Sequence, residues 1–409
     1  MKYKNKICIL LNWSREVDMY NEIIDLFPTE KIDNIINNIK TLEKERKGNT
    51  EDIKKNLINK NKNFLYFSDI YKKTKYKIVI STGLTNSLKI TPYSIFRYFY
   101  GQTIGRLLDI TNISKWLERF LGRPFNADGK KSRIGLMWYP ERKIGNTVIK
   151  YPTGMDLKLK WYPINELEKN FDIFFTHSEF EKSLINKKFY NKVYKIIGYP
   201  RYSKLDNEEK IINNLKKEFK LDYSKKILFW TPTHIHYKKE TFKNFLPWID
   251  KIHKLNNDYN IIVRPHPKAV NLNYEIVNTF KQKNFFVDLN SERKIGDLFK
   301  ISDMVICDYG GTIFDAMYLE KPILLLNMEN KSVYVKELSE NLSLDIELRK
   351  HLYNFDTDVD YKTIKDKILL TFGNEYKEKI LFLKKKYFGD IKDKSSSIEL
   401  IRFLENFLN

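Results

Sequence analysis

The chain has 409 residues, of which 42% are hydrophobic and 14% aromatic, so it is long enough for two domains that each bury a core. Its 73 Lys and Arg against 52 Asp and Glu give a net charge of +21, which favours an anionic partner, although an organism-wide preference for lysine would produce the same excess. Basic and aromatic residues do not alternate at the spacing typical of nucleic-acid binding, so nucleic acid is not an expected partner.

The first half of the chain contains six short apolar runs that we predict as buried strands. They lie at 6–12, 64–68, 77–81, 147–152, 172–178 and 193–198. Cys8 lies in the first run and Cys307 in a similar run further on, so both are expected to be core residues without a disulfide or metal role. After the run at 172–178, Ser178 and Glu181 have the spacing of a capping box, which favours a structural role for His177.

Residues 92–145 do not follow this alternation, and we expect a helical insertion there. Aromatic residues and leucines are interspersed with the basic residues Arg97, Arg106, Lys115, Arg119 and Arg123. This composition is typical of helices at a membrane interface, but an insertion packed on its own domain can have the same pattern. Whether residues 92–125 make peripheral contact with a membrane is therefore left open.

From residue 226 onwards strands and helices alternate regularly. Apolar runs at 226–232, 260–265, 285–289, 304–310 and 322–327 are predicted as strands, and the segments at 241–256, 274–283, 293–301 and 312–320 as helices, the first of them despite Pro247. Parallel strands joined by crossover helices form a doubly wound sheet.

The same alternation in both halves predicts an α/β protein with two Rossmann-like domains that face each other across a cleft. We place the first domain at 1–200, the second at 201–380, and a final helix at 381–409 that packs back on the first domain. Ligands of such sheets bind outside the carboxyl ends of the strands, so residues that follow strands are the site candidates.

The strand at 260–265 ends in Arg264-Pro265-His266-Pro267. The two prolines deny the backbone both helix and ladder geometry and present the imidazole rigidly. A guanidinium offers a planar fork to phosphate oxygens, and a histidine can donate a hydrogen bond to a departing pyrophosphate. We expect Arg264 and His266 to bind phosphate; the alternative is a histidine held structurally between prolines.

A glycine pair follows the strand at 304–310 and opens a helix. Free amides at a helix start can hold phosphate, and glycines allow close backbone approach. We expect Asp308 to cap or orient this turn and Asp315 to reach a ribose. The residues expected to hold phosphate are Tyr309, Gly310, Gly311 and Thr312.

Thr233 and His234 follow the strand at 226–232 and are expected at the same edge of the sheet. His234 and His236 have no third ligand nearby in sequence, so we expect no metal site. We expect the hydroxyl and the imidazole to contact phosphate or the acceptor; the alternative is a polar loop without a functional role.

Four motifs in this order resemble the CDP-glycerol glycerophosphotransferase family, the teichoic acid primases and polymerases. They are GYPR at 198–201, TPTH at 231–234, VRPHP at 263–267 and SDMVICDYGGTIFDAMYLEKPILLL at 302–326. The resemblance covers roughly residues 145–330. It implies the GT-B fold, a reaction that needs no cofactor, and a donor nucleotide whose phosphates are gripped by Arg264, His266 and the turn at 308–312.

The chain departs from the family pattern at two places. The Ser-Ser pair of the family is Gly310-Gly311 here, and the family's base histidine matches Thr153 in YPTGMDLK. Because a threonine is not a base near neutral pH, either Asp156 is the base or the reaction differs, for example by using a CMP-activated sugar; a plain turn residue is the alternative for Asp156. The residues expected on the acceptor side are Thr153, Lys158 and Arg201.

We therefore predict a transferase that moves a glycerol-phosphate-type group or a sugar from a CDP- or CMP-activated donor to a cell-surface glycan or lipid-linked acceptor. The expected process is capsule, teichoic acid or lipopolysaccharide-type biosynthesis. No run of eighteen apolar residues or secretory signal is present, which predicts a cytoplasmic or peripheral inner-membrane location. The alternatives are a nucleotide-sugar 2-epimerase of the same architecture and a basic protein that binds acidic polymers without catalysis.

Overall fold

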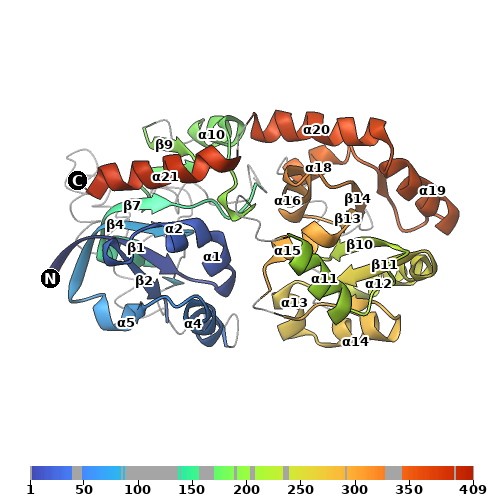
Figure 1. Cartoon of the computed structure of the whole chain (residues 1–409), viewed down its shortest axis with the longest axis horizontal. Coiled ribbons are helices and arrows are strands. Elements are labelled where there is room, and N and C mark those ends of the chain that lie inside the picture. The colour runs from blue at the N-terminus through green and yellow to red at the C-terminus, as the bar shows by residue number, and fades with distance from the viewer. Residues whose placement is uncertain are drawn as a thin grey trace, which may run out of the picture. The chain divides into compact units, whose positions relative to one another are not determined.

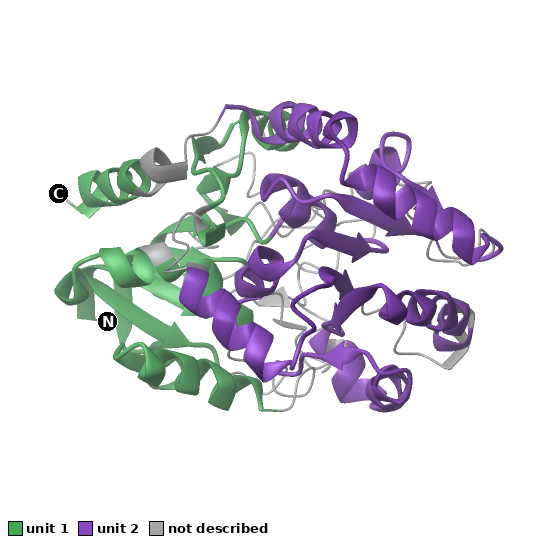
Figure 2. Ribbon diagram, turned by 45° about the vertical axis from the view of Figure 1, so that its right-hand side comes forward, with its two compact units in different colours: residues 1–153, 163–203, 391–409 green, residues 154–162, 204–390 purple. Residues whose placement is uncertain are grey.

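The structure is a computed structural model that describes residues 2–38, 48–83, 86–87, 137–138, 140–155, 170–187, 191–202, 208–233, 239–290, 293–327, 343–390 and 393–408. The chain forms two compact units (Figure 2). Unit 1 comprises residues 1–153, 163–203 and 391–409, and unit 2 comprises residues 154–162 and 204–390. Our expected boundaries lay at 200 and 380; the second falls inside a helix of unit 2.

Unit 1 contains a seven-stranded parallel sheet. Its order is β3 (Phe64–Tyr66), β2 (Ile32–Ile36), β1 (Lys2–Leu11), β4 (Thr74–Ser81), β7 (Gly145–Lys150), β8 (Ile173–Thr176) and β9 (Val193–Ile196). Alternate residues of β1 enter two different cores: Ile7, Ile9 and Leu11 pack in one, Cys8 and Leu10 in the other. A strand buried on both faces explains why its sequence is a continuous apolar run.

Helices cover both faces of this sheet (Figure 1). They are α1 (Ser14–Met19), α2 (Asn21–Leu26), η1 (Thr29–Lys31), α4 (Asn49–Asn59), α5 (Phe67–Ile70), α8 (Pro140–Ile144), α10 (Glu179–Asn186), η4 (Pro200–Tyr202) and α21 (Asp393–Leu408). The last helix, α21, packs Leu400, Leu404 and Leu408 into the same core as Ile7. Two short antiparallel strands, β5 (Asn86–Ser87) and β6 (Met137–Trp138), form a separate two-stranded sheet.

Unit 2 contains a six-stranded parallel sheet. Its order is β12 (Phe286–Val287), β11 (Tyr259–Val263), β10 (Lys226–Thr231), β13 (Met304–Cys307), β14 (Ile323–Leu326) and β15 (Asn354–Phe355). The helices are α11 (Glu208–Glu218), α12 (Lys239–His253), η6 (Lys254–Asn257), α13 (Pro267–Leu272), α14 (Glu275–Gln282), α15 (Ile295–Ile301), α16 (Thr312–Tyr318), α18 (Leu344–Leu348), α19 (Tyr361–Thr371) and α20 (Asn374–Phe388).

Both sheets have the same connectivity. In each, the first strand is followed by two strands on one side and then by the remaining strands on the other, which is the doubly wound Rossmann order. The point where the direction reverses lies between β1 and β4 in unit 1 and between β10 and β13 in unit 2. Ligands of such folds bind at the carboxyl ends of these two strands.

The predicted strands and most predicted helices are confirmed. Pro247 lies inside α12, as expected, and Cys8 and Cys307 are buried free cysteines in strands. Most of the expected insertion at 92–145 lies outside the described residues; of it, β6 and α8 are described. In the described part of the chain, no helix has the length and apolar character needed to cross a membrane.

Candidate functional site

The candidate site lies at the carboxyl ends of β11, β10 and β13 in unit 2. These three strands are neighbours and parallel, with β10 in the middle. The segments that follow them therefore meet at one edge of the sheet, where the strand order reverses. These segments carry most of the predicted site residues.

Asp308 joins the ends of β10 and β13. Its carboxylate accepts hydrogen bonds from the N–H of Thr233 at 3.1 Å to each oxygen and from the N–H of Tyr309 at 2.7 Å. The Thr231 hydroxyl donates to the Thr312 hydroxyl at 3.2 Å. Asp308 is 1% exposed, so its carboxylate depends on these hydrogen bonds for its polar partners, and the same hydrogen bonds hold the two turns together.

The turn after β13 needs a glycine at Gly310, which has φ +98°. The Gly310 N–H donates to Asp345 Oδ2 at 2.9 Å, so a protein carboxylate occupies this predicted phosphate donor. Gly311 is the N-cap of α16, which begins at Thr312. Gly311 and Thr312 are both partly exposed at the start of the helix.

Arg349 braces this turn from outside the predicted motifs. It donates from Nη1 to the Asp345 carbonyl at 2.7 Å and from Nη2 to the Asp308 carbonyl. Its guanidinium carbon lies 3.9 Å from the centroid of the Tyr309 ring. Neither Asp345 nor Arg349 was predicted from the sequence, and their i,i+4 spacing is the local signal that could have found them.

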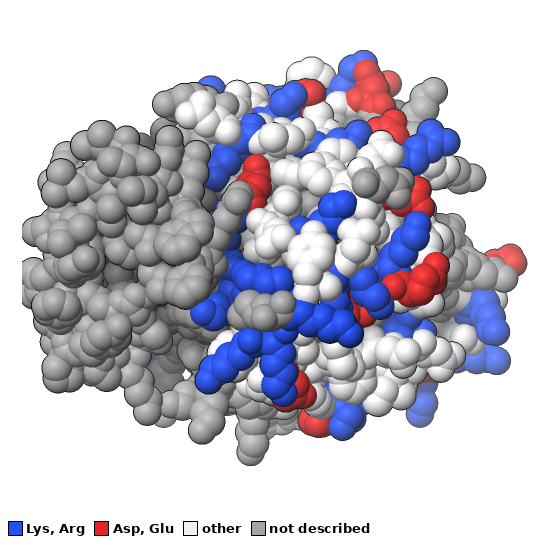
Figure 3. Space-filling model, turned by 90° about the vertical axis from the view of Figure 1, so that its left-hand side faces the viewer, with Lys and Arg blue, Asp and Glu red and all other residues white. Residues whose placement is uncertain are grey.

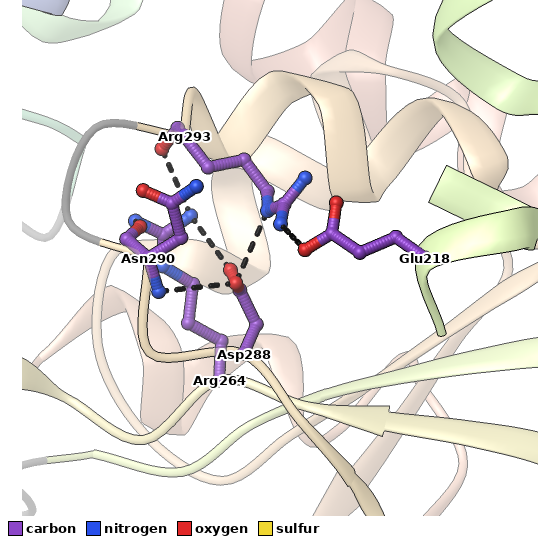
Figure 4. Close-up of polar contacts among 5 residues, drawn as sticks. All are labelled: Glu218, Arg264, Asp288, Asn290 and Arg293. Carbon is purple, nitrogen blue, oxygen red and sulfur yellow. Dashed lines mark hydrogen bonds and ion pairs between the residues drawn. The ribbon is translucent and has the colours of Figure 1, made fainter. Parts of the chain in front are cut away.

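Arg264 lies at the end of β11 and is engaged by the protein (Figure 4). Its Nη1 lies 3.3 Å from Asp288 Oδ2 and donates to the Arg293 carbonyl at 3.0 Å, while Nη2 donates to the Asn290 carbonyl at 3.2 Å. Arg293 contacts the other oxygen of Asp288 through Nε at 3.1 Å and pairs with Glu218. In this arrangement, Arg264 fixes the loop that follows β12.

His266 is partly exposed at the same edge. Its carbonyl accepts hydrogen bonds from the N–H groups of Ala269 at 2.8 Å and Val270 at 3.2 Å, so α13 starts directly after it. Our expectation that the two prolines exclude a helix here was wrong. Pro267 is the first residue of α13, because its fixed φ and missing N–H suit the first helical position.

Asp315 and Cys307 are buried behind the turn. Burial raises the pKa of Cys307 to about 12, and Asp308 and Asp315 add to this, while the Thr231 and Thr312 hydroxyls oppose it. The thiol is therefore neutral at physiological pH. Asp315 is 6% exposed, which places it below the surface where a ribose was expected to meet it.

The equivalent edge of unit 1 holds a buried polar cluster that was not predicted from the sequence. Asn12, after β1, donates to the Ser81 hydroxyl at 3.1 Å and accepts from Asn37 Nδ2 at 2.7 Å. Glu16 accepts from the Asn12 N–H at 2.6 Å and from the Thr82 hydroxyl at 2.5 Å. Burial raises the pKa of Glu16 to about 7, although these hydrogen bonds lower it.

The acceptor-side residues that the structure describes lie in unit 1. Thr153 is exposed after β7, and Arg201 Nε donates to Asp18 Oδ2 at 3.2 Å. The predicted cap is confirmed, since the Ser178 hydroxyl accepts a hydrogen bond from the Glu181 N–H at 3.2 Å and Ser178 is the N-cap of α10. Asp156, Lys158 and His234 lie outside the described residues.

None of the described residues form a group of three or more His, Cys, Asp or Glu side chains suited to a metal ion. The described site combines the carboxylates of Asp288, Asp308 and Asp345 with hydroxyls, main-chain amides, two arginines and one histidine. The hydroxyls, amides and basic side chains among these groups can bind phosphate by hydrogen bonds and charge.

A family model described as CDP-glycerol:poly(glycerophosphate) glycerophosphotransferase matches residues 139–346, just over half of the chain. The teichoic acid poly(glycerol phosphate) polymerase of Bacillus spizizenii is 30% identical over 175 residues, which cover 40% of each chain. The teichoic acid glycerol-phosphate primase of Bacillus subtilis is 26% identical over 210 residues, covering 50% of this chain and 48% of the relative. The matched stretches thus span less than half of either relative.

Solved structures of the wall teichoic acid polymerase TagF have the same fold. One aligns with a TM-score of 0.57 at 15% identity and another with 0.60 at 14%, both over 99% of this chain and 89% or 90% of the other. This likeness shows the GT-B fold, and the family model covers the whole edge from Thr231 to Asp345. The chain therefore belongs to the CDP-glycerol:poly(glycerophosphate) glycerophosphotransferase family.

Proposed function

We propose that this protein transfers glycerol phosphate from CDP-glycerol to a hydroxyl group of a teichoic-acid-type acceptor. The observation that carries the proposal is the edge of unit 2 where the strand order reverses between β10 and β13. Asp308 joins two turns there, and His266 follows the neighbouring strand β11. This edge lies within the segment matched by the family model. The description of the matched family supplies the donor class, and the names of the matched relatives supply the acceptor class.

In the proposed reaction, the acceptor oxygen bonds to the phosphorus that carries glycerol, and the bond from that phosphorus to the bridging oxygen breaks. CMP departs with the electron pair. His266 donates a hydrogen bond to the departing phosphate, and the partly exposed Gly311–Thr312 turn binds the phosphate oxygens. The hydroxyl proton passes to a base, for which Asp156 remains our candidate.

Arg264 supports this site through the loop that it holds. Its guanidinium is engaged by Asp288 and by the carbonyls of Asn290 and Arg293, so we assign it the positioning of these three residues after β12. The remaining predictions, including Thr233 and His234 as donor contacts and Thr153, Lys158 and Arg201 on the acceptor side, belong to the same proposal. No metal or cofactor is part of it.

Capsule or lipopolysaccharide-type acceptors, and a CMP-activated sugar as donor, are alternative substrates that we propose for the same site. A nucleotide-activated donor and a lipid-linked acceptor meet at the inner face of the cell membrane, where we place the protein. The family membership favours glycerophosphate transfer over 2-epimerisation.

Thermal unfolding with added CDP-glycerol, CDP, CMP, UDP or GDP tests the nucleotide site. Donor at about 100 times its Kd stabilises the folded chain by about 2.7 kcal/mol, and we expect cytidine nucleotides to give the largest shift. His266→Ala should reduce this shift, whereas the control His351→Ala, at an exposed position outside the site, should retain it. An equal shift in both variants, or none in the wild type, would count against the site.

Transfer itself is tested by following CMP release and the incorporation of labelled glycerol phosphate into a poly(glycerol phosphate) primer. The proposal expects both to depend on primer. Donor converted without primer into an isomer, detected by NMR, would favour the epimerase alternative instead.

A further inference from the structure

Three buried carboxylates lie close to the turn that follows β13. Asp308 begins the turn, Asp315 lies in the first turn of α16 and Asp345 in α18, and they are 1%, 6% and 0% exposed. Asp308 accepts hydrogen bonds from main-chain N–H groups, and Asp345 accepts from the Gly310 N–H and the Ser343 hydroxyl. These donors are neutral and do not cancel the charge of a carboxylate. Negative charge behind the turn opposes the approach of a phosphate.

Arg349 contacts the same turn from the end of α18. Its Nη1 and Nη2 donate to the main-chain carbonyls of Asp345 and Asp308. Its Nε donates to the side-chain oxygen of Asn327 at 2.8 Å, and Nη2 lies 3.5 Å from the Leu326 carbonyl. All of these acceptors are neutral, and in the described part of the chain Arg349 makes no ion pair with a carboxylate. Its positive charge is therefore not cancelled by a direct partner.

These contacts fix the guanidinium at the carboxyl edge of the sheet. Asp308 follows β13, Leu326 ends β14, and Asn354 of β15 donates from Nδ2 to the Arg349 carbonyl at 2.6 Å. The three strands are neighbours in the sheet. The guanidinium also lies 3.9 Å from the centroid of the Tyr309 ring. Arg349 thus places a fixed charge at the sheet edge where ligands of such folds bind.

Two further arginines at this edge have carboxylate partners. Arg264 Nη1 lies 3.3 Å from Asp288 Oδ2, and Arg293 Nε donates to Asp288 Oδ1 at 3.1 Å. Arg293 also pairs with Glu218. Two guanidinium groups thus meet two carboxylates, whereas Arg349 has no such pair among the described residues. The arginine that was not predicted from the sequence therefore carries the less balanced charge.

Exposed basic residues do not provide the same effect. The chain has 73 Lys and Arg against 52 Asp and Glu, and Figure 3 shows Lys and Arg side chains gathered on one face. Salt screens such solvated charges over about 10 Å at about 0.1 M ionic strength. Arg349 is only partly exposed and contacts the turn directly, so its charge is screened less.

We propose that Arg349 makes the turn at 308–312 competent to bind the donor diphosphate, because it holds the turn through the Asp308 carbonyl and offsets the carboxylates of Asp315 and Asp345. This inference rests on the proposed function, which places the donor phosphates at this turn. Arg349 is a positioning residue: it sets the geometry and the electrostatic potential of the turn, and no bond to phosphate is assigned to it. It lies beyond residue 346, where the match to the family model ends.

The test is isothermal titration of the full chain with CDP and with inorganic pyrophosphate. Arg349→Gln should weaken the binding of both by about tenfold, because a fixed positive charge beside the phosphates is removed. The matched control is Lys350→Gln, which removes the same charge from the next, exposed position and should change either affinity by less than about twofold. Equal losses in the two variants, or none in Arg349→Gln, would overturn the proposal.

A charge-compensating variant separates electrostatics from mere structural support. Asp345→Asn removes one negative charge behind the turn, while its amide oxygen can still accept from the Gly310 N–H, so CDP binding should strengthen by about threefold. In Arg349→Gln/Asp345→Asn the loss caused by Arg349→Gln should be largely recovered. If Asp345→Asn weakens binding and the double variant is no better than Arg349→Gln, the charge of Arg349 is not what the turn requires.

Thermal unfolding without ligand shows whether each variant is folded. If Arg349→Gln is unfolded, Arg349→Lys takes its place, because it keeps the charge and loses the planar fork to the carbonyls. Its CDP affinity should lie between that of the wild type and a tenfold loss, and Asp345→Asn should raise it again. No recovery by Asp345→Asn would count against the proposal in this background as well.

The result can be distinguished from failure of the proposed function. Pyrophosphate binding that depends on Arg349, without binding of CDP-glycerol, would reject the donor assignment and keep the role of Arg349. CDP-glycerol binding that is equal in the wild type and in folded Arg349→Gln would keep the donor site and reject that role. Binding of neither ligand to the wild type would reject both.

Discussion

The two sheets have the same strand order but stabilise their buried carboxylates in different ways. In unit 2, Asp288 lies between the guanidinium groups of Arg264 and Arg293. In unit 1, Glu16 is fully buried and accepts hydrogen bonds from an amide and a hydroxyl. A buried carboxylate with a cationic partner can remain charged, whereas one with neutral donors is protonated more readily. One fold therefore supports an edge held by charge and an edge sensitive to pH.

The largest expected effect comes from removing the charge that holds the unit 2 edge. Asp288→Ala leaves Arg264 and Arg293 facing each other in a poorly solvated site, and we expect a loss of about 3–5 kcal/mol in the free energy of unfolding. Denaturant unfolding measures it. The control Asp250→Ala removes an exposed carboxylate paired with Lys283 and should cost less than about 1 kcal/mol. Similar losses would contradict the central position of Asp288.

Glu16 should make the stability of the chain depend on pH. Because its pKa is raised in the folded state to about 7, from an ordinary value of 4.5, its contribution to stability is fully present below pH 4.5 and is lost as the pH rises through 7. The loss amounts to about 3 kcal/mol. Glu16→Gln should remove this pH-dependent component in unfolding experiments from pH 5 to pH 8.

The exposed Glu375→Gln is the control for this measurement, and its pH profile should match that of the wild type. If Glu16→Gln also follows the wild-type profile, Glu16 is charged in the folded chain, and the contrast between the two edges disappears.

A smaller effect should follow from Gly310→Ala. Nothing lies within 4 Å of a Cβ placed there, so the cost comes from φ +98° alone, about 1–2 kcal/mol. Gly389→Ala meets equally open space at φ +74° and should destabilise by a similar amount. We expect Gly310→Ala, but not Gly389→Ala, to weaken the CDP-glycerol thermal shift. Equal thermal shifts in both variants would show that the turn at Gly310 is not part of the nucleotide site.

The smallest expected effect is at the amino-terminal edge of unit 2. Lys226 and Asp303 are 3.5 Å apart, and their side chains are 52% and 38% exposed. Lys226→Gln should change the free energy of unfolding by less than about 1 kcal/mol, which denaturant unfolding measures. A loss as large as that expected for Asp288→Ala would contradict the contrast between an exposed ion pair and the buried carboxylate of this unit.

The sequence predicts most of the fold because buried parallel strands are continuous apolar runs. β2 was missed because Asp33 and Asn34 interrupt its apolar pattern; Asp33 pairs with Lys4 and Lys6 of β1, and the Asn34 amide donates to the Asn63 carbonyl. β15 was missed because it has two residues, Asn354–Phe355. Both strands depend on partners that are distant in the sequence.

The candidate site was predictable in its location but not in its contacts. Strand ends and glycines identify the edge at 308–312, since both leave local patterns. The engagement of Arg264 by Asp288 joins residues from different strands, and the bond from Gly310 to Asp345 spans 35 positions. No local periodicity encodes such pairs, so the sequence suggested an arginine available to phosphate where the structure has one that fixes a loop.

The packing of α21 affects the order in which the two units can fold during synthesis. Leu400, Leu404 and Leu408 complete the core around Ile7, and the Leu408 carbonyl accepts hydrogen bonds from Asn5 and Lys77. During synthesis, the apolar face of the first sheet therefore stays partly uncovered until residues 393–408 have been translated. Unit 2, most of which is the continuous segment 204–390, can close earlier, so unit 1 starts before unit 2 in the sequence and is completed after it.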